Sequence, residues 1–184
     1  MVRAGLSGAQ VVPGRVEPVV AGQPFSVLVD YSHTPDSLEN VLRAVRAVTD
    51  GRLLAVFGCG GDRDRGKRPL MGAVAAGLAD LAVLTSDNPR GEDALSIIAE
   101  VMTGVPAEAA GHVLVEPDRR AAIRRALAAA RAGDALVIAG KGHETYQILG
   151  PRTIHFDDRE VAAEELAALG YGDGPAVASP EGRP

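Results

Sequence analysis

The chain has 184 residues, of which 46% are apolar, with a formal net charge of −5 and a single cysteine, Cys59. This length suits one domain with a substantial core. The scattered basic residues argue against a nucleic-acid partner, and one cysteine excludes an internal disulfide or a cysteine-rich metal site. No apolar run reaches the ~18 residues that span a bilayer, and no basic-then-apolar leader is present. We therefore expect a cytoplasmic protein with no membrane partner.

The two ends of the chain differ in composition from the middle. Residues 1–24 are punctuated by glycine and proline and are predicted to form a linker. Residues 172–184 are rich in Gly, Pro, Ala and Ser and are predicted to form a flexible tail. The domain itself is expected to span residues 25–171.

Within the domain, short apolar runs alternate with amphipathic stretches. The first run, 25–29, predicts a strand, and the helix after it is expected to have Thr34 as N-cap and Pro35 as its first residue. Its predicted apolar face carries Leu38, Val41, Leu42, Val45 and Val48. Further along the chain we expect strands at 53–57, 81–85, 112–115 and 135–139, helices at 70–78, 94–102 and 119–131, a hairpin at 146–149 and 153–156, and a last helix from Asp157 or Asp158 to Leu169.

This alternation predicts an α/β fold, Rossmann-like, with a mostly parallel sheet of about six strands and helices on both faces. Ligands of such open sheets bind beyond the carboxyl ends of the strands. Four polar loops fall there, at 30–33, 58–67, 87–90 and 140–144. Their common position predicts one binding site at that edge of the sheet.

The loop Asp87-Asn88-Pro89-Arg90 presents a guanidinium on a proline-stiffened turn. Such a planar group suits bidentate capture of a carboxylate. Glu144 lies in the glycine-rich loop that begins at Gly140, and its carboxylate could accept hydrogen bonds from the ammonium group of a ligand. The alternative interpretation is that Glu144 is an exposed or helix-capping residue. Together the two loops favour a ligand that carries both charges.

The stretch Gly61–Lys67 has the spacing of a phosphate-binding Walker A loop, GxxxxGK. The next residue is Arg68 rather than Ser or Thr, so the hydroxyl that would hold Mg²⁺ is missing. We therefore predict a glycine turn that presents Arg63 and Lys67 to anionic ligands, against the alternative of a solvated charged loop. For Cys59 we predict a packing role, and no pair of histidines has zinc-ligand spacing.

These loops together resemble the C-terminal domain of the Mur ligases, most closely of the members that add diaminopimelate. The resemblance covers roughly residues 10–170 in colinear order, with Ser32 as one departure where alanine is usual. It is carried by Pro13-Gly14-Arg15-Val16-Glu17, Asp30-Tyr31-Ser32-His33-Thr34-Pro35, Gly58-Cys59-Gly60-Gly61-Asp62-Arg63-Asp64, Asp87-Asn88-Pro89-Arg90, Gly140-Lys141-Gly142-His143-Glu144 and Asp157-Asp158-Arg159.

The resemblance implies roles for particular residues. Those implied to hold meso-diaminopimelate are Arg63, Asp87, Asn88, Pro89, Arg90, Gly140 and Glu144. Those implied to contact ATP are Arg15, Asp30, His33 and Lys67. Arg90 is the expected specificity residue, because lysine offers no distal carboxylate for a guanidinium to bind. No catalytic residue and no metal ligand is assigned within the chain.

In the reaction that the resemblance implies, ATP phosphorylates a carboxylate of UDP-N-acetylmuramoyl-dipeptide, and the amine of diaminopimelate attacks the acyl phosphate. The linker at 1–24 would follow a missing central domain, which is expected to supply the Mg²⁺ ligands, and an N-terminal domain is missing too. We expect the chain alone to make no product. Two alternatives stay open: a ligase for another amino acid (lysine-adding or folylpolyglutamate type), and a non-catalytic Rossmann-like nucleotide-binding module. The second would need GxGxxG after the first strand, where this chain has Asp30-Tyr31-Ser32-His33.

Overall fold

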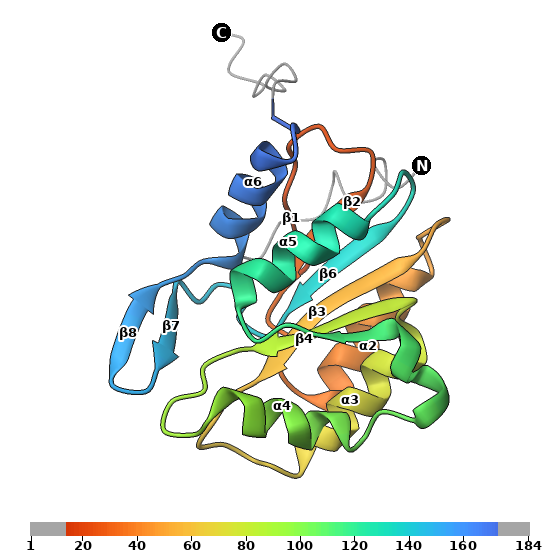
Figure 1. Cartoon of the computed structure of the whole chain (residues 1–184). Coiled ribbons are helices and arrows are strands. Elements are labelled where there is room, and N and C mark those ends of the chain that lie inside the picture. Colours follow the sequence, from red (N-terminus) through yellow and green to blue (C-terminus); the bar gives the residue numbers. More distant parts are fainter. Residues whose placement is uncertain (1–13, 173–184) are drawn as a thin grey trace, which may run out of the picture.

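A computed structural model of the chain describes residues 14–172. Most of the predicted linker and nearly all of the predicted tail lie outside these residues. Within them, six strands form one sheet in the order β1-β2-β6-β3-β4-β5 (Figure 1). The strands are β1 (Glu17–Pro18), β2 (Ser26–Asp30), β3 (Leu53–Cys59), β4 (Leu81–Ser86), β5 (Val113–Val115) and β6 (Ala135–Ala139).

All neighbouring strands are parallel except β1, which pairs antiparallel with β2 through Glu17↔Val29 and Pro18↔Leu28. The sheet therefore begins inside the stretch predicted to be a linker. The sequence analysis placed no strand there, because two residues, one of them a proline, give no periodic signal. The predicted class, a mostly parallel α/β sheet of about six strands, is confirmed.

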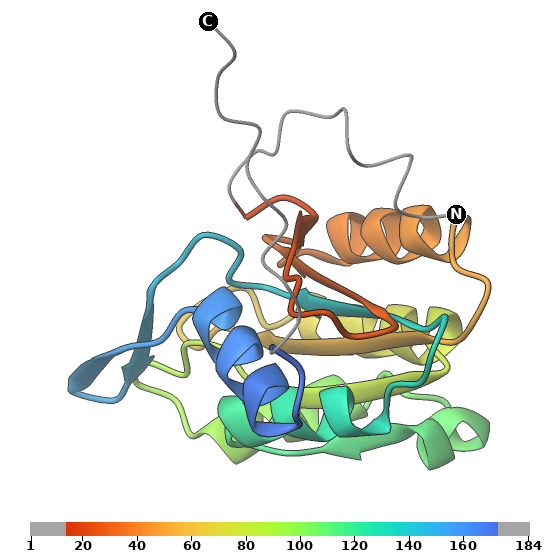
Figure 2. The ribbon, with the colours of Figure 1, turned by 90° about the horizontal axis from the view of Figure 1, so that it is seen from above.

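The helices cover both faces of the sheet (Figure 2). One face packs against α2 (Pro35–Arg46), α3 (Lys67–Leu78), α4 (Ala94–Met102) and the 3₁₀ helix η1 (Ala107–His112). The other packs against α5 (Arg119–Ala129) and α6 (Asp158–Ala168). Alternate residues of β2, β3 and β6 enter the two apolar cores, which is why their apolar runs are continuous.

Local signals fix most helix starts. Thr34 caps α2 in a capping box with Ser37, and Pro35 is its first residue. Three aspartates cap later helices: Asp93 for α4, Asp118 for α5 and Asp157 for α6. These starts confirm the predictions.

Several expectations were wrong in detail. Strand β3 runs to Cys59, two residues past the predicted end, and His112 belongs to η1 rather than to β5. Helix α3 starts at Lys67 rather than residue 70, because Pro69 is tolerated in a first turn. Helix α5 ends at Ala129, two residues before the predicted Arg131. Val48 follows the end of α2 and is exposed, so it does not share the buried face of that helix.

A small hairpin extends beyond the carboxyl edge of the sheet (Figure 1). Its strands are β7 (Tyr146–Leu149) and β8 (Arg152–His155), close to the predicted positions. It is joined to the loop after β4, where the backbone N–H of Arg90 donates to the carbonyl of Ile148 at 3.2 Å. The hairpin thus belongs to the edge of the sheet that carries the polar loops.

Candidate functional site

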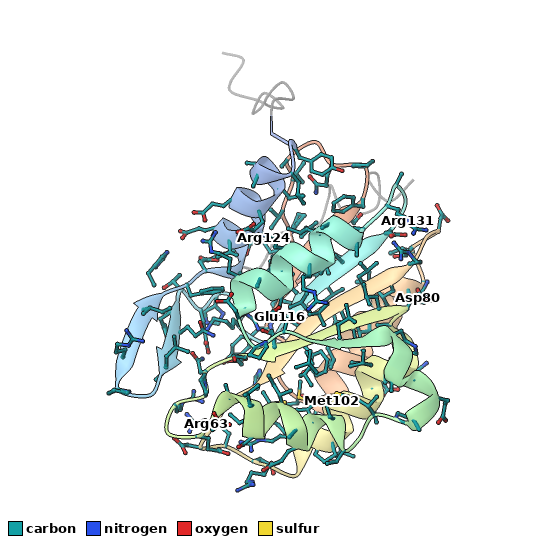
Figure 3. All side chains as sticks on the ribbon, viewed as in Figure 1. Arg63, Asp80, Met102, Glu116, Arg124 and Arg131 are labelled. Carbon is teal, nitrogen blue, oxygen red and sulfur yellow. The ribbon has the colours of Figure 1, made fainter. Side chains whose placement is uncertain are left out.

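The loops after β2, β3, β4 and β6 meet at one end of the sheet. Because β6 lies between β2 and β3, its loop is flanked by theirs. In Figure 3, Arg63 lies at this end, whereas Asp80 and Arg131 lie at the opposite end. The loops enclose a cavity of about 500 Å³, here called the site cleft. It is lined by Tyr31, His33, Thr34, Gly60, Arg63, Asp64, Lys67, Asp87, Asn88, Arg90, Gly140, Glu144 and Tyr146.

The charged lining of the site cleft is balanced. Three cationic side chains, Arg63, Lys67 and Arg90, face three carboxylates, Asp64, Asp87 and Glu144. A pocket for phosphate alone would favour positive charge throughout. The mixture suits a small ligand that carries both signs of charge.

Arg90 is held by its backbone and by its side chain. It has a φ of +53°, which is uncommon for a residue other than glycine and is found at functional sites. Its Nη1 donates to the carbonyl of Gly61 at 2.9 Å and approaches that of Asn88 at 3.4 Å. Its Nε and Nη2 have no hydrogen-bond partner among residues 14–172, so they are available to a ligand carboxylate.

Asn88 connects the loop after β4 with the loop after β6. Its Nδ2 donates to Oε2 of Glu144 at 2.9 Å, and its Oδ1 accepts from the backbone N–H of Ile148 at 2.9 Å. This arrangement fixes the orientation of the amide. It also holds the Glu144 carboxylate against the wall of the site cleft. Pro89 between Asn88 and Arg90 is buried and is not part of the lining.

Asp87 and Gly140 are in close contact. Burial raises the pKa of the Asp87 carboxyl, while the charges of Arg119 and Lys141 act in the opposite direction. Gly140 has a φ of +115°, and a Cβ there would lie 2.8 Å from Oδ2 of Asp87. Only glycine leaves room for this carboxylate.

A buried ion pair lies behind the loops at this end of the sheet. Arg119 donates through Nε and Nη2 to Asp158 at 2.8 and 2.7 Å, and both side chains are fully buried. Arg119 also donates to the carbonyls of Ser86 and Ala139, the last residues of β4 and β6. It therefore fixes the points from which two of the site loops begin.

The loop after β3 does not form a phosphate cradle. Arg68, at the position where a Walker A loop has Ser or Thr, is buried and paired with Glu92 at 2.7 Å and Glu100 at 2.8 Å. The bonds from Arg68 lower the pKa of Glu92 to about 2. Arg63 is exposed, and Nζ of Lys67 donates to the carbonyl of His33 at 2.7 Å. The rejection of a P-loop is consistent with this geometry.

The residues expected to contact ATP divide between two cavities. His33 and Lys67 line the site cleft, whereas Arg15 and Asp30 line a second, mainly apolar cavity of about 540 Å³ between β2 and α2. Arg15 stacks over the ring of Tyr31, 5.5 Å from its centre. Both carboxylate oxygens of Asp30 accept hydrogen bonds within the chain, Oδ2 from the N–H of Val16 and Oδ1 from that of Ser32. In this arrangement Asp30 holds the segment before β1 in place.

The sequence analysis missed two buried side chains behind the site. Lys141 donates to Glu144, and Gln147 donates through Nε2 to the carbonyl of Asp87 at 2.8 Å. Lys141 lies in the motif Gly140-Lys141-Gly142-His143-Glu144, and this was the only sequence feature that pointed to it. Gln147 is 60 residues from Asp87, and nothing local marks this contact.

Other candidate chemistry is not supported. Cys59 is buried beside Met71, and burial raises the pKa of its thiol to about 11, as a packing role predicts. Among residues 14–172, no group of three or more His, Cys, Asp or Glu side chains is arranged to hold a metal ion. No helix in the described range is long and apolar enough to cross a bilayer.

Comparison with known proteins gives a consistent result. The family pattern described as "Mur ligase, glutamate ligase domain" matches residues 14–142. Two curated relatives carry the name UDP-N-acetylmuramoyl-L-alanyl-D-glutamate–2,6-diaminopimelate ligase. The relative from Solibacter usitatus is 55% identical over 171 residues, which are 93% of this chain and 34% of the relative. The relative from Synechococcus elongatus is 60% identical over 158 residues, 85% of this chain and 31% of the relative.

Solved structures agree. A structure of a UDP-N-acetylmuramoyl-L-alanyl-D-glutamate–2,6-diaminopimelate ligase superposes with a TM-score of 0.81 at 43% identity, covering 89% of this chain and 33% of that one. A folylpolyglutamate synthase from Thermotoga maritima shares the fold alone, with a TM-score of 0.52 and 22% identity over 76% of this chain and 30% of that one. The parallel α/β fold is thus shared with a domain of these ligases. The chain belongs to the Mur ligase family, and it spans about a third of the length of the curated relatives it matches.

Proposed function

We propose that this chain is the amino-acid-binding domain of an ATP-dependent ligase that adds meso-diaminopimelate to UDP-N-acetylmuramoyl-L-alanyl-D-glutamate in peptidoglycan synthesis. The observation that carries the proposal is the site cleft, in which Arg90 and Glu144 are brought together from different loops. The names of relatives 55–60% identical to the chain point the same way.

The proposed ligand carries a carboxylate and an ammonium on its distal carbon. Arg90 has two guanidinium nitrogens available for the carboxylate, and Glu144 offers a carboxylate to the ammonium. Arg63, Asp87, Asn88 and Gly140 complete the lining of the proposed amino-acid site, and Pro89 is proposed to support it from its buried position between Asn88 and Arg90. A lysine-adding ligase would have no use for Arg90, which makes that alternative the weaker one.

ATP is proposed to lie beside the same loops, near His33 and Lys67, with Arg15 and Asp30 at the neighbouring cavity. The Mg²⁺ ligands and the site for the UDP-linked dipeptide are proposed to belong to parts of the ligase outside this chain, in the cytoplasm. The role of the chain is then to hold the attacking amine in place for the acyl phosphate and to exclude water when the domains close.

The test is calorimetric titration of the 184-residue chain with meso-diaminopimelate and with L-lysine. We expect meso-diaminopimelate to bind at least about tenfold more tightly, because one charge-assisted contact at Arg90 separates the two ligands. Arg90→Met should remove the preference, and Arg125→Met, at an exposed arginine of α5, should keep it. Equal binding of both ligands by the native chain, or binding of neither, would contradict the proposal.

A further inference from the structure

Lys141 is one of only two lysines in the chain, against seventeen arginines, and its side chain is fully buried. Burying an ammonium is costly unless the charge is paired. Its Nζ lies 3.2 Å from Oε2 of Glu144, donates to the carbonyl of Tyr146 and sits 5.3 Å from the centre of the Tyr146 ring. Glu144 and Tyr146 line the site cleft and Lys141 does not, so Lys141 lies directly behind the wall.

The hydrogen bonds of Glu144 are unequally divided between its two oxygens. Oε2 accepts from Nζ of Lys141 at 3.2 Å and from Nδ2 of Asn88 at 2.9 Å. Oε1 accepts no hydrogen bond from any residue in 14–172. The carboxylate is therefore anchored through one oxygen, while the other remains available to the cleft that Glu144 lines.

The local charges explain why a lysine is needed here. Asp87 is a second carboxylate in the same cleft and is buried, and the charge of the partly buried Glu144 makes the ionisation of Asp87 harder. Two carboxylates close together in a poorly solvated site repel each other. The charges of Arg119 and Lys141 both offset this repulsion, and of the two it is Lys141 that also donates a hydrogen bond to Glu144.

We propose that Lys141 is the positioning residue for ammonium recognition: it anchors Oε2 of Glu144 and so directs Oε1 toward an ammonium group in the site cleft. The inference rests on the proposed function, since it assigns a task within the same amino-acid site. The competing explanation is a purely structural one, in which Lys141 only ties the loop after β6 to the start of β7.

The two explanations differ in which ligands the variant Lys141→Met affects. Methionine matches the apolar stem of lysine but lacks the ammonium group. Meso-diaminopimelate carries the distal ammonium, whereas L-2-aminopimelate keeps the distal carboxylate and lacks that ammonium. By calorimetry on the 184-residue chain, Lys141→Met should weaken the binding of meso-diaminopimelate about tenfold. The affinity for L-2-aminopimelate should stay within about twofold of that of the native chain.

The outcomes separate this inference from the proposed function. An equal loss of affinity for both ligands, or no loss for either, would overturn the role of Lys141 while leaving the function intact. Failure of the native chain to prefer meso-diaminopimelate over L-lysine would instead contradict the function. Arg125→Met, at an exposed arginine of α5 outside the site cleft, should leave the ratio of the two dissociation constants as in the native chain.

A second measurement applies even if Lys141→Met fails to fold. Lysine labelled with ¹³C at Cε gives only two side-chain signals in this chain, one from Lys67 and one from Lys141. Glu144→Gln should shift the Lys141 signal and leave that of Lys67 in place. Addition of meso-diaminopimelate to the native chain should shift the Lys141 signal more than L-2-aminopimelate does. A Lys141 signal that is insensitive to Glu144→Gln would overturn the proposal.

Discussion

The carboxylate of Asp87 is buried at the site cleft, and neither of its oxygens accepts a hydrogen bond from residues 14–172. Because burial raises its pKa, the folded chain holds the Asp87 proton more tightly than the unfolded chain does. The unfolded state therefore releases this proton first as pH rises, and the contribution of Asp87 to stability is lost as pH rises through the folded pKa. Burying this ionisable carboxyl therefore costs stability at neutral pH.

Asp87→Asn should accordingly raise the free energy of unfolding at pH 7. The gain should shrink as pH falls toward ~4, the usual pKa of an aspartate, where the residue becomes protonated in both states. Urea denaturation of both chains across this pH range measures the difference. Asp50→Asn, at an exposed aspartate, serves as the control and should change little. A loss of stability at pH 7 in Asp87→Asn would contradict this account of the carboxylate.

At the scale of elements, the Arg119–Asp158 pair links α5 and α6 to the ends of β4 and β6. Removing one partner of a buried pair leaves the other charge uncompensated, which typically costs about 3–5 kcal/mol. Arg119→Met should therefore destabilise the chain by about that amount in urea denaturation. Arg125→Met, on the same helix, breaks only an exposed pair with Glu116 and should cost less than about 1 kcal/mol. Similar losses in the two variants would show that burial of the first pair has no special weight.

The elements were predictable where a local signal marks them. Thr34 with Pro35, and the three capping aspartates, place helix starts from a few neighbouring residues. The two-residue strand β1 was not predictable, because its pairing with β2 depends on a chain reversal rather than on its own composition. The exposure of Val48 was not predictable either, because the apolar periodicity of α2 continues in the sequence past the residue at which the helix ends.

At the scale of the whole molecule, the parallel order of the strands accounts for the site. The sequence indicates that the polar loops share one edge, because every parallel strand ends there. It gives no sign of how the side chains pair, as the contact between Asn88 and Glu144 spans 56 residues. Arg15 and Asp30 line one cavity, whereas His33 and Lys67 line the other. This separation, too, could be seen only in three dimensions. The positions of these loops were thus predictable from the sequence, whereas the buried residues that orient them were not.

The site cleft is proposed to bind both charged groups at the far end of an amino acid. A crystal structure of the 184-residue chain with meso-diaminopimelate tests it most directly. We expect the distal carboxylate to accept hydrogen bonds from the guanidinium of Arg90 and the distal ammonium to donate to Oε1 of Glu144. A ligand ordered with its distal end away from both side chains, or bound outside the site cleft, would contradict the account.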